Sequence, residues 1–399
     1  MTTAMKRIFI VAGEHSGDAL GAKLMTALTA RLGGAVTFAG VGGHNMEAAG
    51  LSSLYPLADI TVMGPFAILR RLPVLVRRVY QTVDAALAFE PDLVVIVDAP
   101  EFTHPVAKRI RKRRPGIPII DYVSPTVWAW RPGRAHAMAP YVDHVLALLP
   151  FEPQAHRELG GPKCTYVGHP LLEKQPWIKA LDPGPFQRKL GLDAARPVLV
   201  VLPGSRTSEV ERLMAVFGEA VARVVAGQPD VQVVVPAMPN VRAMIEARLN
   251  VWPEAARVRA VVISAEDEAA KIAAFKLARA ALAASGTVAL ELALTRTPMV
   301  IAYRVDAVIS TLRHLIMAKT CVLPNLITGE RAVPEFLQED CTPDKLAAAV
   351  TAAMGETPAR SAQLAELDAV PELLALPGGV SASEAAAEVV AGYLGGEAR

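Results

Sequence analysis

The sequence predicts an α/β protein built from two doubly wound parallel sheets, one in each half of the chain. Three observations predict this fold class. The chain has 399 residues, more than one hydrophobic core usually spans. Short runs of apolar residues alternate with longer helical patterns along the chain. These runs are apolar throughout, as expected for strands that helices cover on both faces.

The pattern divides the chain at a segment rich in Pro, Gly and charged residues, 175–197. We expect strands at residues 8–11, 37–39, 93–97, 117–122 and 144–148 of the first half, a short helix at 185–190, and strands at 198–202, 231–235, 258–263, 280–284 and 299–302 of the second half. The predicted domains are residues 1–175 and 176–375. Residues 376–399 contain a last helix, and the sequence leaves open on which half it packs. Two such halves are expected to bind ligands in a shared cleft, at the carboxyl ends of their strands.

The composition excludes several classes of protein. Hydrophobic residues make up 52% and charged residues 20%, which excludes a disordered chain. The formal net charge of +2 gives no support to a nucleic-acid partner. Cys164, Cys321 and Cys341 lie far apart, so neither a disulfide framework nor a zinc site is expected, and a reducing cytoplasm fits. The sequence shows neither a signal peptide nor an apolar run long enough for a spanning helix.

The turn Pro203-Gly204-Ser205-Arg206 follows an expected buried strand and precedes an amphipathic helix. Gly204 permits a tight turn that presents backbone N–H groups and the Ser205 hydroxyl to an anion. The guanidinium of Arg206 matches phosphate oxygens bidentately and suits a diphosphate. The alternative is an ordinary strand-to-helix turn with a surface arginine.

A second candidate phosphate site is Ser285-Gly286-Thr287, at the end of another expected strand. Ser285 or Thr287 is expected to cap the following helix while N–H groups at the helix start meet phosphate. Glu291, one turn further, is placed to accept the two hydroxyls of a ribose. The alternative is a plain cap and a solvated glutamate. Neither loop is a Walker A motif or a dinucleotide fingerprint, which disfavours triphosphate hydrolysis and redox chemistry.

The first half carries candidate acid–base groups after two of its expected strands. Glu14 and His15 are candidate bases in the loop after the first strand, where Ser16 and Asp18 are candidates to hold substrate hydroxyls. A helix cap is the alternative for Asp18. Asp98 follows the apolar run 93–97, where a partly desolvated carboxylate is suited to take a proton from an attacking hydroxyl. Strand-end aspartates also serve as turn caps.

Two further segments suggest an acceptor pocket and contact with a membrane surface. Trp128, Trp130 and Arg131 lie together in one polar loop and are expected to line an acceptor pocket, with packing beneath the loop as the alternative. Residues 63–78 interleave large apolar residues with arginines, an interfacial pattern that predicts attachment to an anionic membrane surface without spanning. A helix with a solvated basic face is the alternative; residues 306–319 are a weaker second candidate. The residues expected at the membrane are Phe66, Leu69, Arg70, Arg71, Leu75, Arg77 and Arg78.

Motifs from one end of the chain to the other together carry a resemblance to a known family. They are Gly13 to Asp18, Val62-Met63-Gly64, Asp98-Ala99-Pro100, Tyr122-Val123-Ser124-Pro125, Val127 to Arg131, Leu149 to Glu152, Gly168-His169-Pro170, Leu202 to Arg206, Ala284 to Thr287 with Ala289-Leu290-Glu291, and Leu323-Pro324-Asn325-Leu326. In these motifs the chain resembles the lipid-A-disaccharide synthases, glycosyltransferases of the GT-B type with two Rossmann-like domains. Two departures are visible: His15 stands where the family often has Thr, which weakens it as an essential base, and Glu101 stands where it often has Asp.

The resemblance implies transfer of 2,3-diacylglucosamine from its UDP derivative to 2,3-diacylglucosamine 1-phosphate, which gives a β-1,6-linked disaccharide phosphate and UDP. It implies an acceptor and catalytic-base role for the first domain and a donor role for the second. It adds Met63 and Ser124 to the acceptor site and Asn325 to the donor site. It also implies an enzyme on the cytoplasmic face of the inner membrane of a Gram-negative bacterium, with a homodimer as one alternative for its assembly.

An α-linked donor and a β-linked product require one displacement with inversion. We expect Asp98 to deprotonate the acceptor hydroxyl, with Glu14 as the alternative base and Ser16 beside it. Ser205, Arg206 and the helix start at 285–287 are expected to stabilise the leaving diphosphate without a cofactor or metal, because the sequence has no D-x-D motif. A nucleotide-sugar epimerase and a non-catalytic nucleotide-sugar binding protein remain as alternative functions.

Overall fold

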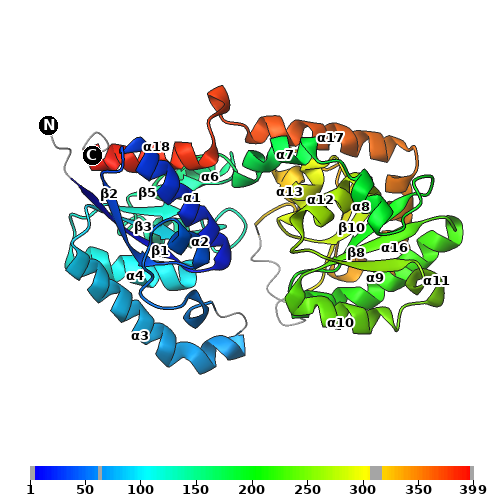
Figure 1. The fold of residues 1–399 in the computed structure, drawn as a ribbon, viewed down its shortest axis with the longest axis horizontal. Coiled ribbons are helices and arrows are strands. Elements are labelled where there is room, and N and C mark those ends of the chain that lie inside the picture. Colours follow the sequence, from blue (N-terminus) through cyan, green and yellow to red (C-terminus); the bar gives the residue numbers. More distant parts are fainter. Residues whose placement is uncertain (1–4, 62–64, 306–316, 396–399) are drawn as a thin grey trace. The chain divides into compact units, whose positions relative to one another are not determined.

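The computed structural model describes residues 5–61, 65–305 and 317–395, and the chain forms two compact units (Figure 1). Unit 1 comprises residues 1–173 and 375–399, and unit 2 comprises residues 174–374. The chain therefore leaves unit 1 and returns to it for its last helix. In the described part of each unit, the core is a six-stranded parallel sheet.

The sheet of unit 1 has the strand order β2-β1-β3-β4-β5-β6. The first five strands correspond to the five predicted ones. β6 was not predicted, because its sequence, KCTY, is short and polar. The strands are β1 (Lys6–Ala12), β2 (Val36–Val41), β3 (Leu93–Val97), β4 (Ile119–Tyr122), β5 (His144–Ala147) and β6 (Lys163–Tyr166).

Helices cover both faces of this sheet, and successive strand residues face opposite sides, as the strand period requires. Ile8 and Ile10 pack toward α1, α2 and α18, whereas Phe9 and Val11 pack toward α3 and α4. The helices of unit 1 are α1 (His15–Arg31), α2 (His44–Ala48), α3 (Pro65–Phe89), α4 (Pro100–Arg113), α5 (Gly133–Met138), α6 (Glu152–Glu158) and α18 (Ala382–Gly395), with 3-10 turns η1 (Leu57–Asp59), η2 (Pro170–Lys174) and η5 (Pro377–Gly379).

The last helix, α18, packs beside α1. The two helices come from opposite ends of the chain, so Figure 1 draws α1 in blue and α18 in red. Ala386, Ala387 and Val390 bury their side chains in the same cluster as Leu24 and Leu28 of α1. Lys6 Nζ donates to the carbonyl of Leu394 at 3.0 Å, at the far end of the helix. The structure thus answers what the sequence left open: the C-terminal segment completes the first domain.

The sheet of unit 2 has the strand order β12-β11-β10-β7-β8-β9. Five of these strands correspond to predicted ones. β12 was not predicted because it has only three residues. The strands are β7 (Val198–Leu202), β8 (Gln232–Ala237), β9 (Ala260–Ser264), β10 (Ala278–Ala284), β11 (Met299–Tyr303) and β12 (Glu335–Leu337).

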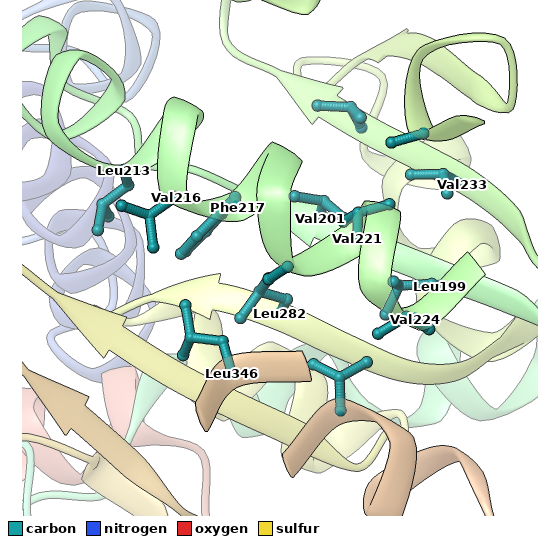
Figure 2. Packing of buried hydrophobic residues seen from close by; sticks show 14 of the residues in the cluster. Leu199, Val201, Leu213, Val216, Phe217, Val221, Val224, Val233, Leu282 and Leu346 are labelled. Atoms are coloured by element: carbon teal, nitrogen blue, oxygen red, sulfur yellow. The ribbon is translucent and has the colours of Figure 1, made fainter. Parts of the chain in front are cut away.

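The largest core of unit 2 lies between this sheet and the amphipathic helix α9. Figure 2 shows Phe217 and Val221 of α9 over Val201 and Leu282 of the sheet, with Leu346 of α16 beside them. The helices of unit 2 are α7 (Gln175–Ala180), α8 (Gly184–Lys189), α9 (Thr207–Gly227), α10 (Pro239–Leu249), α11 (Glu254–Arg257), α12 (Glu268–Leu277), α13 (Val288–Leu294), α15 (Leu323–Thr328), α16 (Pro343–Met354) and α17 (Pro358–Leu374), with the 3-10 turn η4 (Gln338–Asp340).

The strand order places a topological switch point in each sheet. In unit 1 the chain runs outward from β1 to β2 and then returns to β3 on the other side of β1. In unit 2 the same reversal occurs between β7 and β10. Loops at the carboxyl ends of the two strands at a switch point diverge and leave a crevice for ligands. The four loops concerned begin after Ala12, Val97, Leu202 and Ala284.

Candidate functional site

At the switch point of unit 1, the loop after β1 meets the turn after β3. Gly13 is required there, because a Cβ atom at this position would lie 2.2 Å from the Cβ atom of Ala99. This close approach lets the start of α1 reach the end of β3. The Ser16 hydroxyl donates to Asp98 Oδ2 at 3.3 Å, and the Ala99 N–H donates to Asp98 Oδ1 at 2.7 Å. Ser16 and Asp98, two of the three residues predicted to be catalytic, are therefore neighbours.

The turn that presents Asp98 is strained. Asp98 and Ala99 have φ of 54° and 45°, in the left-handed region that side chains other than glycine rarely adopt. Each such residue costs about 1–3 kcal/mol and persists where the surrounding fold imposes it, often at functional sites. The strain turns the partly exposed Asp98 carboxylate away from the buried strand β3 and toward Ser16.

Glu14 and His15 occupy the same loop at the start of α1. Glu14 is the N-cap residue of the helix without a side-chain cap hydrogen bond, and its side chain is half-buried. His15 is exposed. Glu14 therefore remains the predicted alternative base at this switch point, whereas His15 faces solvent.

Asp18 does not have the role that the sequence suggested. It is 1% exposed, and its carboxylate accepts hydrogen bonds from the N–H groups of Gly43, Asn45 and Met46 and from the Asn45 side chain, at 2.7–3.0 Å. Burial opposes its ionisation, but these bonds outweigh burial and hold the pKa of Asp18 below its ordinary value. Asp18 fixes the start of α2 and offers no surface to an acceptor.

Ser124 is likewise buried and is not placed to touch an acceptor. Its hydroxyl donates to the Pro125 carbonyl at 3.0 Å and lies 2.9 Å from His156 Nε2. His156 is fully buried, and burial lowers its pKa to about 4. The pair fixes the loop after β4 to α6.

The tryptophans of the following loop are held by packing. Trp128 is half-buried, meets Phe151 edge to face at 5.1 Å and donates through Nε1 to Glu152 Oε1 at 3.1 Å. Burial raises the pKa of Glu152 to about 7, against the bonds from Leu149, Trp128 and Leu148. Trp130 is half-buried, and the guanidinium of Arg131 lies over its ring at 4.9 Å. Trp130 and Arg131 therefore remain available as acceptor contacts, whereas Trp128 anchors the loop.

The helix expected at the membrane, α3, shows a mixed face. Leu75 packs against the core of unit 1, and Arg78 pairs with Asp59 and lies over the Tyr55 ring at 4.5 Å, so both are structural. Arg71 donates to the Ala58 carbonyl at 3.0 Å. The exposed side chains of the helix include three arginines and several apolar residues, namely Arg70, Arg71, Arg77, Leu72, Val74, Val76 and Tyr80. Met63 and the side chains of Phe66 and Leu69 lie outside the described residues.

In unit 2, both candidate phosphate motifs line one pocket of about 440 Å³ at the switch point. The turn after β7 forms one wall and the turn after β10 the other. The pocket brings together six of the seven predicted donor residues with Lys271, which the sequence reasoning missed. The predicted members are Ser205, Arg206, Ser285, Gly286, Thr287 and Glu291.

The turn after β7 differs from the expectation in one respect. Gly204 has φ of 124°, as a tight turn requires, but the N–H groups of Ser205 and Arg206 donate to Glu209 Oε2 at 3.0 and 3.3 Å. The Glu209 carboxylate, in the first turn of α9, thus occupies both amides at the start of this helix. An anion in this pocket would therefore meet the exposed side chains of Ser205 and Arg206 instead of their backbone amides.

The turn after β10 leaves its helix start uncapped by a side chain. Thr287 is the N-cap residue of α13 without a side-chain cap hydrogen bond, and the Ser285 hydroxyl donates instead to the carbonyl of Cys321 at 2.9 Å. Gly286 and Thr287 are exposed in the pocket. The predicted capping by Ser285 or Thr287 is thus wrong, because Ser285 is bonded to a distant segment.

Glu291 forms an ion pair in the pocket with Lys271 of α12. Lys271 Nζ lies 2.8 Å from Glu291 Oε1, and both side chains are 18% exposed. The pair fixes the carboxylate and adds a cation to the pocket. No sequence motif marked Lys271, because it lies on the outer helix α12 and reaches the switch point only through the packing of that helix.

Asn325 is 3% exposed and does not line the donor pocket. Its side-chain amide donates to the Val333 carbonyl at 2.9 Å, and its side-chain oxygen accepts from the Val333 N–H at 3.2 Å. These bonds fix the segment around α15. The expectation that Asn325 contacts the donor is replaced by an indirect role, since this segment includes the Cys321 carbonyl that receives Ser285.

Within the ranges that the structure describes, no group of three or more His, Cys, Asp or Glu side chains is placed to hold a metal ion. None of the helices in those same ranges is long and apolar enough to cross a membrane.

The sequence matches the family model of lipid-A-disaccharide synthetase, LpxB, over residues 8–388. The chain belongs to this family. It is 49% identical over 394 residues to the lipid-A-disaccharide synthase of Rhodopseudomonas palustris strain HaA2, and the alignment covers 98% of each protein. It is 46% identical to the lipid-A-disaccharide synthase of Rhodospirillum centenum strain ATCC 51521 / SW, over 96% of this chain and 93% of that protein.

Solved structures confirm the fold. The UDP-GlcNAc 2-epimerase of Neisseria meningitidis bound to UDP-GlcNAc superposes with a TM-score of 0.62 at 13% identity, covering 97% of this chain and 99% of that one. Acinetobacter baumannii MurG gives a TM-score of 0.56 at 13% identity with the same coverage. At such identities the similarity shows the GT-B fold alone. Together with the family match, it confirms that this lipid-A-disaccharide synthase family member is a glycosyltransferase of lipid A biosynthesis.

Proposed function

We propose that the chain transfers 2,3-diacylglucosamine from UDP-2,3-diacylglucosamine to the 6-hydroxyl of 2,3-diacylglucosamine 1-phosphate, with inversion at the anomeric carbon. The observation that supports this most is the pocket of unit 2, where two turns at a switch point place Ser205, Arg206, Lys271 and Glu291 around one space. That combination of cations, hydroxyls and a fixed carboxylate fits a nucleoside diphosphate.

In this proposal the pocket binds the UDP portion of the donor. Arg206 presents a planar fork to the diphosphate, and the exposed turn at Gly286 and Thr287 offers N–H dipoles at the start of α13. Glu291, held by Lys271, accepts the ribose hydroxyls. As the bond to the sugar breaks, negative charge grows on the leaving diphosphate, and these groups stabilise it.

Asp98 is proposed as the general base. Its carboxylate is partly exposed at the switch point of unit 1, and Ser16 and the Ala99 N–H orient it. It takes the proton of the acceptor 6-hydroxyl as that oxygen attacks the anomeric carbon, and the pair of electrons of the breaking bond leaves with UDP. A single displacement needs no enzyme nucleophile. The cations of the donor pocket supply the charge that a metal supplies elsewhere, so we propose that the reaction is metal-independent.

The same reaction requires the enzyme to reach lipid substrates. We propose that exposed side chains of α3, Arg70 and Arg77 with Leu72, Val74 and Val76, bind an anionic membrane surface without spanning it. The inner face of the inner membrane of a Gram-negative bacterium, where nucleotide sugars are available, is the proposed location.

The test is incubation of the purified enzyme with both substrates in a chelator, followed by chromatography and mass spectrometry for disaccharide phosphate and UDP. We expect both products in equal amounts, and UDP only when the acceptor is present. UDP-GlcNAc 2-epimerases share this fold, which makes an epimerase the second candidate. Conversion of the donor alone to an epimer would favour that candidate and contradict the proposal. UDP release that does not depend on the acceptor would also contradict it.

A further inference from the structure

Unit 1 contains a cavity beside α4 to which no specific role has yet been given, although Arg131 in its lining is a candidate acceptor contact. It has a volume of about 600 Å³ and lies between α4 and the segment that contains α5. Side chains from both segments line it, among them Glu101, His104, Lys108, Arg131, Arg134 and Tyr141.

The cavity carries an excess of positive charge. Three of the side chains, Lys108, Arg131 and Arg134, are cationic, and the one carboxylate among the lining residues is Glu101. Arg134 Nη2 donates to Glu101 Oε1 at 2.9 Å, and Glu101 is 77% exposed. Because this contact uses one of the five N–H donors of the guanidinium, the cavity keeps both net positive charge and donor capacity. Such a lining suits a compact dianion with several acceptor oxygens, which describes a phosphate monoester.

Aromatic rings hold two of the cations in place. The Lys108 ammonium lies 4.9 Å from the centroid of the Tyr141 ring, and the Arg131 guanidinium lies 4.9 Å from that of Trp130. The φ of Arg131 is 53°, a strained value that the loop imposes. Cations fixed before binding lose less conformational entropy when an anion arrives.

A buried chain of hydrogen bonds supports the cavity from below. His104 Nε2 lies 3.1 Å from Asp121 Oδ2, and His104 Nδ1 lies 2.9 Å from the Tyr141 hydroxyl. All three residues are at most 6% exposed. The chain links α4, β4 and the end of the α5 segment, and so it fixes the two walls of the cavity relative to each other.

The cavity begins close to the proposed base. Pro100 and Glu101, at the start of α4, line it, and they follow Asp98 within three residues. In glucosamine 1-phosphate, C1 carries the phosphate and C5 carries the hydroxymethyl group with the 6-hydroxyl. Both carbons are bonded to the ring oxygen. A sugar whose 6-hydroxyl meets Asp98 therefore carries its phosphate a short distance away, on the same edge of the ring.

We propose that this cavity binds the anomeric phosphate of the acceptor sugar, with Lys108, Arg131 and Arg134 as its ligands. The proposal rests on the proposed function, which places the acceptor at Asp98. It makes the cavity the determinant by which the enzyme selects an acceptor that is phosphorylated at C1.

The test replaces Lys108, Arg131 and Arg134 with Gln, singly and together, and measures steady-state kinetics with two acceptors. One is 2,3-diacylglucosamine 1-phosphate, and the other is the same lipid with a methyl glycoside at C1. We expect each substitution to raise KM for the phosphorylated acceptor by about tenfold to a hundredfold, the usual effect of removing a charged hydrogen-bond partner. The donor KM and the kinetics with the methyl glycoside should change little.

Arg113→Gln is the matched control. Arg113 is on α4 like Lys108, but it pairs with Asp84 and does not line the cavity. Circular dichroism and thermal melting check the fold of every variant. If the wild type does not turn over the methyl glycoside, the comparison is made on inhibition by soluble glucosamine 1-phosphate and by glucosamine, and only the former should weaken. Equal losses with both acceptors, or no loss with either, would overturn the proposal while the function stands. A wild type that forms no disaccharide would instead refute the function.

Discussion

The carboxylate of Asp98 lies on a strained turn, and two features shape this part of the chain. Gly13 permits the loop after β1 to approach Ala99, and positive φ values at Asp98 and Ala99 turn the chain sharply after β3. A turn with this cost is retained where a particular side-chain position matters. At the scale of single residues, this geometry explains why Asp98 and Ser16 are neighbours although 82 residues separate them.

Replacing Asp98 with Asn tests its role as general base. The substitution keeps the shape of the side chain but removes its capacity to accept a proton, so we expect kcat to fall by about 10² to 10⁴. Donor affinity, measured by UDP binding calorimetry, should not change, because the donor pocket lies in the other unit.

Asp92→Asn is the control for this prediction. Asp92 precedes the amino end of the same strand, where it accepts from the Arg7 N–H at 2.8 Å and is exposed. Its substitution should leave kcat unchanged. Near-normal turnover in the Asp98 variant would transfer the role of base to Glu14.

At the scale of secondary structure, the start of α9 depends on one glycine. Gly204 has φ of 124°, and a Cβ atom there would lie 2.4 Å from the Cβ atom of Glu209. Gly204→Ala should therefore destabilise unit 2 by about 1–3 kcal/mol and weaken UDP binding, because Glu209 and the Ser205 turn that it holds have to move. Urea unfolding and UDP calorimetry measure the two effects.

Gly227→Ala provides the comparison. Gly227 ends the same helix, and a Cβ atom there would have no neighbour within 4 Å. We expect this substitution to be neutral or stabilising by up to about 1 kcal/mol. If both variants behave alike, the conformation of Gly204 is not what holds the turn.

The arginines of α3 differ in their surroundings and therefore in their expected roles. Arg70 and Arg77 are exposed, whereas Arg78 pairs with Asp59. Arg70→Gln with Arg77→Gln should lower binding to vesicles that contain anionic lipid by roughly tenfold or more, since each arginine contributes about 1 kcal/mol at such a surface. Sedimentation with vesicles measures the loss.

The control for overall electrostatics is a second double variant, which has the same net charge as the α3 variant. It combines Arg242→Gln with Arg248→Gln on α10 of unit 2. It should bind vesicles like the wild type. Arg78→Gln should instead lower the stability of unit 1. Equal sedimentation of all these variants would remove α3 from the membrane contact.

At the scale of the whole molecule, buried ionisable side chains make the stability of unit 1 depend on pH. His144 and His156 of unit 1 are buried, and burial lowers the pKa of each to about 4. A histidine whose pKa is lower in the folded chain stabilises the fold above its ordinary pKa of about 6.5, and this stability is lost as the pH falls toward 4. Glu152, with its pKa raised to about 7, acts in the opposite sense, since its contribution is lost as the pH rises.

The buried histidines and Glu152 change the stability of unit 1 in opposite directions with pH, so the effect of one histidine is measured by comparing variants at two pH values. Replacing His156 with Gln removes one titrating ring, so the drop in unfolding free energy of unit 1 between pH 7 and pH 5 should be smaller by about 1–2 kcal/mol than in the wild type. His136→Gln, an exposed histidine of the same unit, should leave the drop unchanged. Urea unfolding at both pH values decides, and equal drops in wild type and His156 variant would contradict the prediction.

The sequence by itself determined the fold class, most strands and the position of the two turns that are proposed to bind phosphate, because apolar runs, glycines and strand-end polar residues are local signals. It also placed Asp98, Ser16, Arg206 and Glu291 in the segments that follow β3, β1, β7 and β10, where the structure has them. Local signals cannot show which strand lies beside which. The order that brings β1 next to β3 and β7 next to β10, and so creates both switch points, is a property of the folded sheets.

Tertiary structure alone decided which polar residues are available to a ligand. Three residues resemble site residues in the sequence but are buried, namely Asp18, Ser124 and Asn325. Each forms its side-chain hydrogen bonds with another segment of the protein. Lys271 carries no motif, yet packing brings it to Glu291. The physical reason is the same in each case: a side chain's partners come from segments distant in the chain, and burial requires that its polar atoms be satisfied by those partners.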